Sequence, residues 1–156
     1  MAEREHLIAA RHQAPGYAED YAAWLQHQID LMRAGRWSDL DTANLIDEVE
    51  DLGRSEFNAF VSAVEIVLVH MLKWDFQPER RTPSWIASIV EHRRRIIRLL
   101  KQNPSYKSRI AEAIEVAYDT AQAKASGQTN LPLATFPSQN PYDWEAITTR
   151  EHELDA

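Results

Sequence analysis

The segment Ala59–Leu72, which reads AFVSAVEIVLVHML, constrains the fold more than any other part of the chain. Placed on a helix at about 100° per residue, it is apolar on nearly every side, which is typical of a helix buried in a core. The same segment carries Glu65 and His70. Because an unpaired ion loses its hydration in a core, each group must find a partner or change its pKa. We therefore expect this helix to form the centre of the fold and the first place to look for a functional site.

Length and composition favour a single globular domain. The chain has 156 residues, of which 44% are hydrophobic and 26% charged. It has no cysteine, which excludes disulfides, thiolate metal sites and cysteine nucleophiles and fits a reducing compartment. No apolar run near the N-terminus has signal-peptide length, and Ala59–Leu72 is shorter than the roughly 20 residues that span a bilayer. We expect a cytoplasmic protein that does not bind a membrane.

Prolines and glycines mark the expected helix ends. Thr82-Pro83, Asn103-Pro104 and Asn140-Pro141 each place a capping residue before a proline that suits the first helical position. Gly35 and Gly127 follow periodic segments, as expected of left-handed residues that end helices. The predicted helices cover residues 17–34, 42–52, 55–74, 83–102, 104–126 and, as a short helix, 141–149.

These boundaries predict an all-α fold, an up-and-down bundle of four to five main helices with a C-terminal loop and short helix strapped onto it. Gly53 leaves one boundary open, because it either ends a helix or kinks a longer one. We expect one bundle domain over residues 15–150, a flexible tail at 1–14 and a second tail at 151–156. The loop before the short helix is expected to pack on the bundle through Leu131, Leu133 and Phe136.

A candidate polar cluster lies at or near the apolar faces of the predicted helices. Its members are Glu48, Glu65, His70, His92 and Arg93. The planar guanidinium of Arg93 can bind a carboxylate through two parallel hydrogen bonds. We therefore predict that Arg93, with His92 beside it, is neutralised by Glu48 or Glu65 at the edge of the core. Such a pair either fixes only how the helices pack, or forms a small pocket for an anionic ligand or a metal.

Metal ligation has little support in the sequence. Helical di-iron proteins need Glu-x-x-His pairs on two core helices, and the only such pair here joins Glu3 to His6. A three-histidine site would need His27, His70 and His92, and no pattern brings these three together. We predict no metal and no cofactor.

Enzyme chemistry is the less favoured interpretation. The sequence has no nucleophile elbow, phosphate-binding loop or dinucleotide fingerprint, and only four glycines from which to build one. General acid–base catalysis by Glu48 or Glu65 stays open, since burial can raise a carboxyl pKa. We assign no catalytic residue.

Charge is unevenly distributed along a chain whose net charge is −7. Ser38–Glu56 carries −6, whereas Lys73–Arg109 carries +7. The two segments can neutralise each other across a helix–helix contact, or the basic segment can bind phosphates or nucleic acid. A pI near 5.3 argues against nucleic acid as a partner.

The basic segment contains a candidate anion or partner patch. Its residues are Lys73, Trp74, Gln77, Arg80, Arg81, Arg94, Arg95 and Arg98. Cations stabilise a helix C-terminus by about 0.3–1 kcal/mol, so part of this patch can be purely structural. Alternatively, arginine and aromatic side chains together bind a phosphate, a nucleotide or an acidic partner.

Several short pieces of the chain resemble one known family. They are Tyr21–Leu25, Asn44–Gly53, His70–Trp74, Gln77–Arg80, Ser84–Trp85, Arg93–Ile97, Leu131–Pro132 and Thr135–Pro137. Together they cover about residues 17–148 and resemble a bacterial family catalogued as a domain of unknown function, number twenty-nine in its series. The resemblance implies a compact helical bundle. It carries no catalytic residue and no activity to this chain.

The preferred functional interpretation is a small helical interaction or regulatory module, with a protein partner or self-association. The first alternative is an enzyme or ligand-binding protein that uses Glu48, Glu65, His92 and Arg93, with His70 secondary. The weaker alternative is nucleic-acid binding through an arginine-rich helix face, which predicts affinity that falls steeply with salt.

Overall fold

The computed structural model describes residues 16–154. Over that range the structure is helical and has no strand, which confirms the predicted all-α class. Contacts between residues divide the chain into two compact units, unit 1 up to Leu52 and unit 2 from Gly53 onward. The single domain predicted over 15–150 stays a prediction, and the predicted tail at 1–14 lies outside the described residues.

Unit 1 is a short helical hairpin. It contains the α2 helix (Tyr21–Arg33), the 3₁₀ helix η1 (Trp37–Asp39) and the first part of the α3 helix (Thr42–Phe76). The Asp20 side chain caps α2 by accepting a hydrogen bond from the Ala23 amide. Gly35 follows α2 with a φ of 70°, which confirms the predicted left-handed stop.

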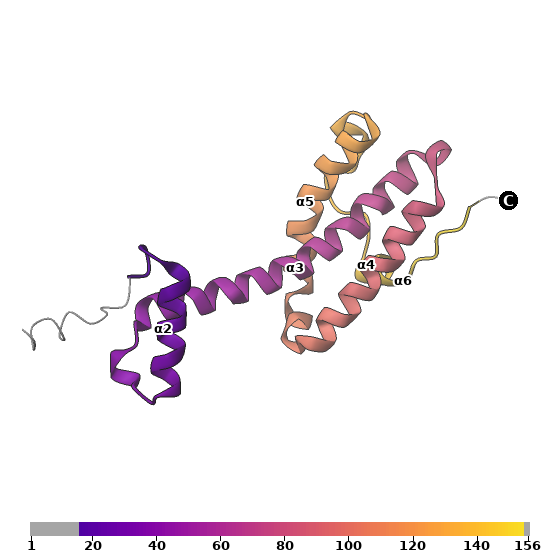
Figure 1. The fold of residues 1–156 in the computed structure, drawn as a ribbon. Coiled ribbons are helices and arrows are strands. Elements are labelled where there is room, and N and C mark those ends of the chain that lie inside the picture. The colour runs from indigo at the N-terminus through magenta and orange to yellow at the C-terminus, as the bar shows by residue number, and fades with distance from the viewer. Residues whose placement is uncertain (1–15, 155–156) are drawn as a thin grey trace, which may run out of the picture. The chain divides into compact units, whose positions relative to one another are not determined.

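The α3 helix is continuous over 35 residues, and Figure 1 shows it without a break. The predicted helices 42–52 and 55–74 are therefore one element, and Gly53 lies inside it. A Cβ built at Gly53 meets no atom within 4 Å, so no close contact requires glycine there. What remains is the entropic disadvantage of glycine in a helix, about 1 kcal/mol relative to alanine.

Unit 2 is built on the rest of α3, followed by α4 and α5. The bounds of its elements are η2 Pro78–Arg80, α4 Pro83–Gln102, η3 Pro104–Arg109 and α5 Ile110–Thr129. The buried faces of α3, α4 and α5 form one apolar cluster. Phe60, Leu68 and Met71 of α3 are fully buried in it, as are Ile89 and Ile96 of α4. The segment that the sequence places at the centre of the fold is indeed the core helix.

The end of α5 differs from the prediction. Gly127 lies inside the helix, and the left-handed residue that ends it is Asn130, with a φ of 57°. Asparagine adopts this conformation more readily than most residues, because its short amide can bond locally. Gly127 was therefore a wrong stop signal.

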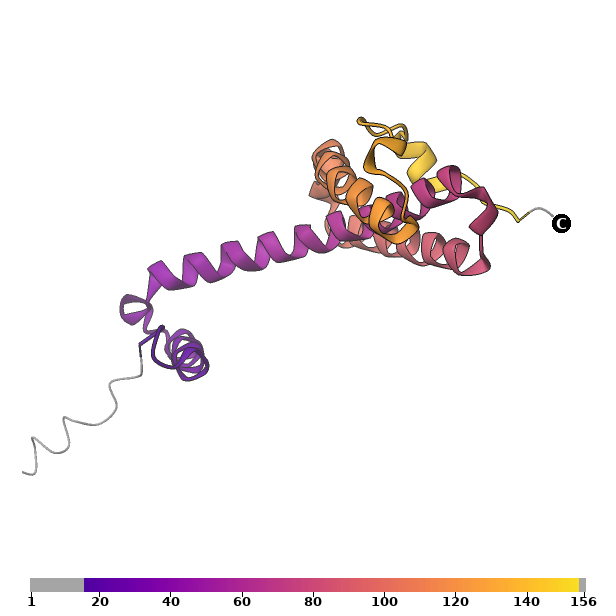
Figure 2. The ribbon, with the colours of Figure 1, turned by 90° about the horizontal axis from the view of Figure 1, so that it is seen from above.

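After α5 the chain folds back over the same helices through η4 (Leu133–Thr135) and α6 (Trp144–Thr149), as Figure 2 shows from above. Phe136 is buried and Leu131 is partly buried, as predicted. Leu133 is 50% exposed, so its predicted packing is wrong. Leu133 belongs to η4, a single turn of 3₁₀ helix that packs only one side against the bundle, so its side chain stays in solvent.

By length and composition alone, α3 could cross a membrane. More than half of its most apolar window is buried inside the structure, and the core helix of a protein in water passes the same test. The observation therefore assigns no location to the chain.

Candidate functional site

Arg93 caps a helix end and does not pair with a carboxylate. Its Nε donates to the carbonyl oxygen of Ile147 at 2.7 Å. Nη1 and Nη2 donate to the carbonyls of Arg150 and Ala146 at 2.6 and 2.9 Å. The carbonyls of Ala146 and Ile147 belong to the last turn of α6, and Arg150 is the residue that follows it. Carbonyls at a helix end lack some of their intrahelical amide partners, although the Ala146 carbonyl also accepts the Arg150 amide. Burial, and then the charge of Arg150, lower the pKa of Arg93.

The two glutamates proposed for that ion pair have other partners, so the prediction is wrong. Glu48 accepts hydrogen bonds from the hydroxyls of Tyr17 and Tyr21 at 2.6 and 2.8 Å. Glu65 forms an ion pair with Lys124 of α5. Helical periodicity located both acids near an apolar face, but it does not distinguish among the tyrosine, lysine and arginine donors that satisfy a carboxylate. The hydrogen bond to Glu48 raises the pKa of Tyr17 to about 12.

The histidines of the predicted cluster bond to their own helices. His70 Nδ1 lies 2.9 Å from the carbonyl oxygen of Ile66, and His92 Nδ1 lies 2.9 Å from that of Ser88. Burial lowers the pKa of His70, with a smaller contribution from the charge of Lys73. Within residues 16–154, no three His, Asp or Glu side chains are arranged to hold a metal ion, so the structure gives the three-histidine alternative no support.

A polar cluster that the sequence did not reveal holds the C-terminal segment. Asp75 accepts two hydrogen bonds from Arg150, at 2.6 and 2.8 Å, and one from the Tyr142 hydroxyl at 2.8 Å. Burial opposes the ionisation of Asp75, but these donors outweigh it and lower the pKa of Asp75. Asp75 and Arg150 are 75 positions apart, and no local pattern signals such a pair.

His152 lies in the segment expected to be a tail, yet it is only 9% exposed. Its ring packs edge-on against Trp74, with ring centroids 5.3 Å apart. Neither ring nitrogen has a hydrogen-bond partner in the part of the chain that the structure describes. Burial, and then the charges of Arg93 and Arg150, lower the pKa of His152 to about 4. The imidazole is therefore neutral at pH 7 and acts as an apolar packing group.

Part of the predicted anion patch comes together in an open pocket at the end of α3. This Lys73 pocket, of about 460 Å³, is lined by Lys73, Gln77, Glu79, Arg80, Arg81, Thr82, Trp85 and Gln128. Lys73 Nζ donates to Gln128 Oε1 at 3.0 Å and lies 4.5 Å from the centre of the Trp85 ring. Gln128 belongs to α5, and the sequence analysis missed it because nothing local links it to Lys73.

Trp74 forms the support for one wall of this pocket. Arg81 Nε donates to the Trp74 carbonyl oxygen at 3.0 Å, and the Arg81 guanidinium carbon lies 4.9 Å from the centre of the Trp74 ring. Gln77 is buried, and its amide donates to the Thr129 carbonyl at 3.3 Å. Trp74 and Gln77 are thus positioned by packing and backbone contacts.

The other arginines of the predicted patch lie on a different surface. Arg94, Arg95 and Arg98 of α4 line a second groove, together with Glu56 and Glu91. One predicted patch is therefore two separate cationic sites in unit 2. The local sequence placed each group correctly on its helix but did not show where the patch divides.

Unit 1 exposes an apolar stripe on the first part of α3. Ile46, Val49 and Leu52 are 58%, 68% and 63% exposed, and Leu45 beside them is partly buried. Thr42, Leu45, Ile46, Val49 and Glu50 line a shallow groove along this stripe. The spacing of three and four residues places these side chains on one helix face. These side chains form an apolar stripe that is exposed along one face of α3.

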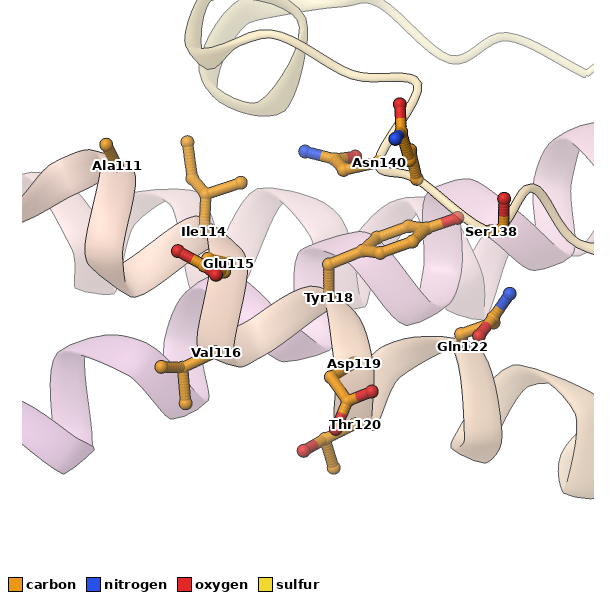
Figure 3. Close-up of a pocket in the computed structure, with 11 residues that line it drawn as sticks. Ala111, Ile114, Glu115, Val116, Tyr118, Asp119, Thr120, Gln122, Ser138 and Asn140 are labelled. Carbon is orange, nitrogen blue, oxygen red and sulfur yellow. The ribbon is translucent and has the colours of Figure 1, made fainter.

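A further groove, of about 890 Å³, lies in unit 2 between α5 and residues 138–140 (Figure 3). Tyr118 reaches from α5 toward Ser138 in this view, and its hydroxyl donates to the Pro137 carbonyl at 2.6 Å. The Gln122 amide donates to the same carbonyl at 2.8 Å. The Tyr118 hydroxyl and the Gln122 amide therefore hold the segment that follows α5 against that helix.

The chain matches the family model described as "Domain of unknown function DUF29" over residues 17–152. The chain belongs to this family. No curated protein and no solved structure gave a significant match. The DUF29 match begins at Tyr17, which bonds Glu48, and ends at His152, which packs on Trp74. It therefore spans the packed part of both units, and the family description assigns no activity.

Proposed function

We propose that this DUF29 protein is an interaction module whose apolar stripe in unit 1 binds a basic amphipathic helix of a protein partner. The observation that carries the proposal is the exposure of Ile46, Val49 and Leu52 on one face of α3. Exposed apolar surface that is continuous along a helix is typical of sites that take up a second helix.

The charge around the stripe supports a basic partner. Ser38–Glu56 has a net charge of −6, and Glu50 lines the groove along the stripe. A partner helix with lysine or arginine beside its apolar face would bring opposite charges together. Pairing two stripes from two copies would bring like charges together, so a second copy fits less well.

The experiment uses the full chain and two labelled synthetic helices. Both have leucine at every third or fourth position over about 20 residues, and one carries lysine where the other carries glutamate. We expect the lysine helix to bind in fluorescence anisotropy, with an affinity that falls as salt rises. Val49→Asp should weaken this binding about tenfold or more, which corresponds to about 1.4 kcal/mol.

Val116→Asp is the matched control, because Val116 of α5 is also an exposed valine, at 54%. This variant should bind the lysine helix as the unchanged chain does. Equal binding of the two helices, or equal weakening by both variants, would contradict the proposal. A dimer in light scattering that Val49→Asp dissociates would also contradict it, because a second copy would then occupy the stripe.

We also propose that the module works in the cytoplasm and does not bind membranes. The absence of cysteine supports a reducing compartment. More than half of the most apolar window of α3 is buried inside the structure, which supports a helix that packs within the protein and does not enter a bilayer. Flotation of the full chain with vesicles of neutral and acidic lipids tests this, and co-migration with either would overturn it.

A further inference from the structure

Lys73 is a buried cation without a counter-ion. Its side chain is 9% exposed, and its Nζ has one hydrogen bond, to the neutral Gln128 amide oxygen. Within residues 16–154, no carboxylate forms an ion pair with it. Burial lowers the pKa of Lys73, which means that the charged form is less stable in the fold than in water. A buried ammonium therefore needs partners that stabilise its charge.

The surroundings of Lys73 carry further unneutralised positive charge. Arg80 and Arg81 line the same pocket, and Glu79 is the single acid in its lining. The hydrogen bond of Arg81 to Trp74 uses only its Nε, so the terminal N–H groups of its guanidinium, which lies over the Trp74 ring, have no hydrogen-bond partner in the described residues. Lys73 likewise has ammonium protons beyond the one given to Gln128. These spare donors belong to residues that line one open pocket.

We propose that the Lys73 pocket binds the phosphate group of a small phosphate monoester. A phosphate dianion offers oxygen acceptors that match several N–H donors at once, and its charge balances the net positive lining. The volume of about 460 Å³ leaves room for a small organic group beside the phosphate. The Trp85 ring, against which the Lys73 ammonium rests, gives that group an apolar wall. This site lies in unit 2 and does not depend on the function proposed for unit 1.

A purely structural role for Lys73 makes a different prediction. A lysine in the last turn of a helix stabilises the helix dipole, and this effect needs no ligand. Lys73 does lie in the last turn of α3, but its hydrogen bond goes to a side chain of α5 and not to the terminal carbonyls of α3. If the role were only structural, phosphate would have no specific effect on the residues of the pocket.

The test is a titration of the full chain with inorganic phosphate and with glycerol 3-phosphate at pH 7.5, with ionic strength held constant by sodium chloride. The indole N–H signals of Trp74 and Trp85 report on the two walls of the pocket in NMR spectra. We expect saturable shifts, and a melting temperature that rises with phosphate by linkage. Lys73→Met keeps the apolar stem of the side chain and should weaken the apparent affinity at least tenfold.

Arg94→Gln is the matched control, because it removes a positive charge from the separate groove of α4 and should leave phosphate binding unchanged. Arg81→Gln is a second variant of the pocket, in case Lys73→Met does not fold. Shifts that do not saturate, or that are equal in the pocket and control variants, would overturn the proposal. Sedimentation with phosphatidic-acid vesicles without any response to the soluble phosphates would also overturn it, because the ligand would then be a lipid headgroup.

Discussion

The two units of this chain bury very different kinds of surface. In unit 1, the buried side chains of α2 are Trp24, Gln28 and Leu31, and one of the three is polar. Gln28 accepts a hydrogen bond from the Asp41 amide, and Trp24 donates to the Asp41 carboxylate. Unit 2 instead buries a large apolar cluster and places its charged groups at the edges. A hairpin held by polar contacts leaves apolar residues exposed, whereas a large core fixes the residues of a pocket.

The largest effect is expected from the core of unit 2. Phe60→Ala removes a ring that is fully buried, and such changes reduce the free energy of unfolding by about 3–5 kcal/mol. Urea denaturation followed by circular dichroism measures this loss. Ile46→Ala in the exposed stripe should change the free energy of unfolding by no more than about 0.5 kcal/mol. Similar losses from both variants would mean that the stripe is buried in solution.

Arg93→Met should have the next largest effect. It removes the side-chain donor from the carbonyls of Ile147 and Arg150 and leaves the Ala146 carbonyl with the Arg150 amide alone, and we expect a loss of about 2 kcal/mol in the free energy of unfolding. Glu65→Gln breaks the ion pair with the exposed Lys124 and should cost less than about 1 kcal/mol. If Glu65→Gln lowered the free energy of unfolding more than Arg93→Met does, the carbonyl contacts of Arg93 would not be the stronger interaction, which would contradict this assignment.

His152 should make the stability of unit 2 depend on pH. Its pKa is lowered from 6.5 to about 4 in the fold, so below pH 6.5 the unfolded chain takes up a proton that the folded chain does not. The contribution of His152 is therefore complete above pH 6.5 and is lost as pH falls toward 4. We expect a loss of about 1–2 kcal/mol over this window, because solvent screening reduces the full effect.

The pH dependence is checked by urea denaturation at several pH values between 4 and 7.5, for the unchanged chain and for His152→Phe. The difference between the two isolates this residue from the carboxylates, which titrate in both. If the two curves stay parallel across the range, the imidazole is not buried in its neutral form.

Gly53→Ala should have the smallest effect and the opposite sign. Because a Cβ at Gly53 meets no atom within 4 Å, the change removes only the entropic disadvantage of glycine. We expect the free energy of unfolding to rise by about 0.5–1 kcal/mol, which would raise the melting temperature by a few degrees. A loss of stability would show that residue 53 is not helical in solution.

Several residues of the Lys73 pocket could be predicted from the sequence, whereas the partners of Arg93 could not. Lys73, Gln77, Arg80 and Arg81 lie within one helix end and the turn that follows, so short-range geometry brings them together. The partners of Arg93 are backbone carbonyls more than 50 residues away. Every residue type carries a carbonyl, so no sequence signal could mark them as the acceptors.

Three features could be predicted from the amino-acid sequence: the all-helical class, the core position of Ala59–Leu72, and the cationic residues that follow α3. These features depend on periodicity, on proline and glycine positions, and on charges close together in the chain, all of which act over a few residues. The partner of each buried polar group depends instead on how the helices pack, because a guanidinium or a carboxylate can form hydrogen bonds with any suitable group that packing brings near. For this reason the contacts of Gln128, Tyr142 and His152 could be identified only in the folded structure.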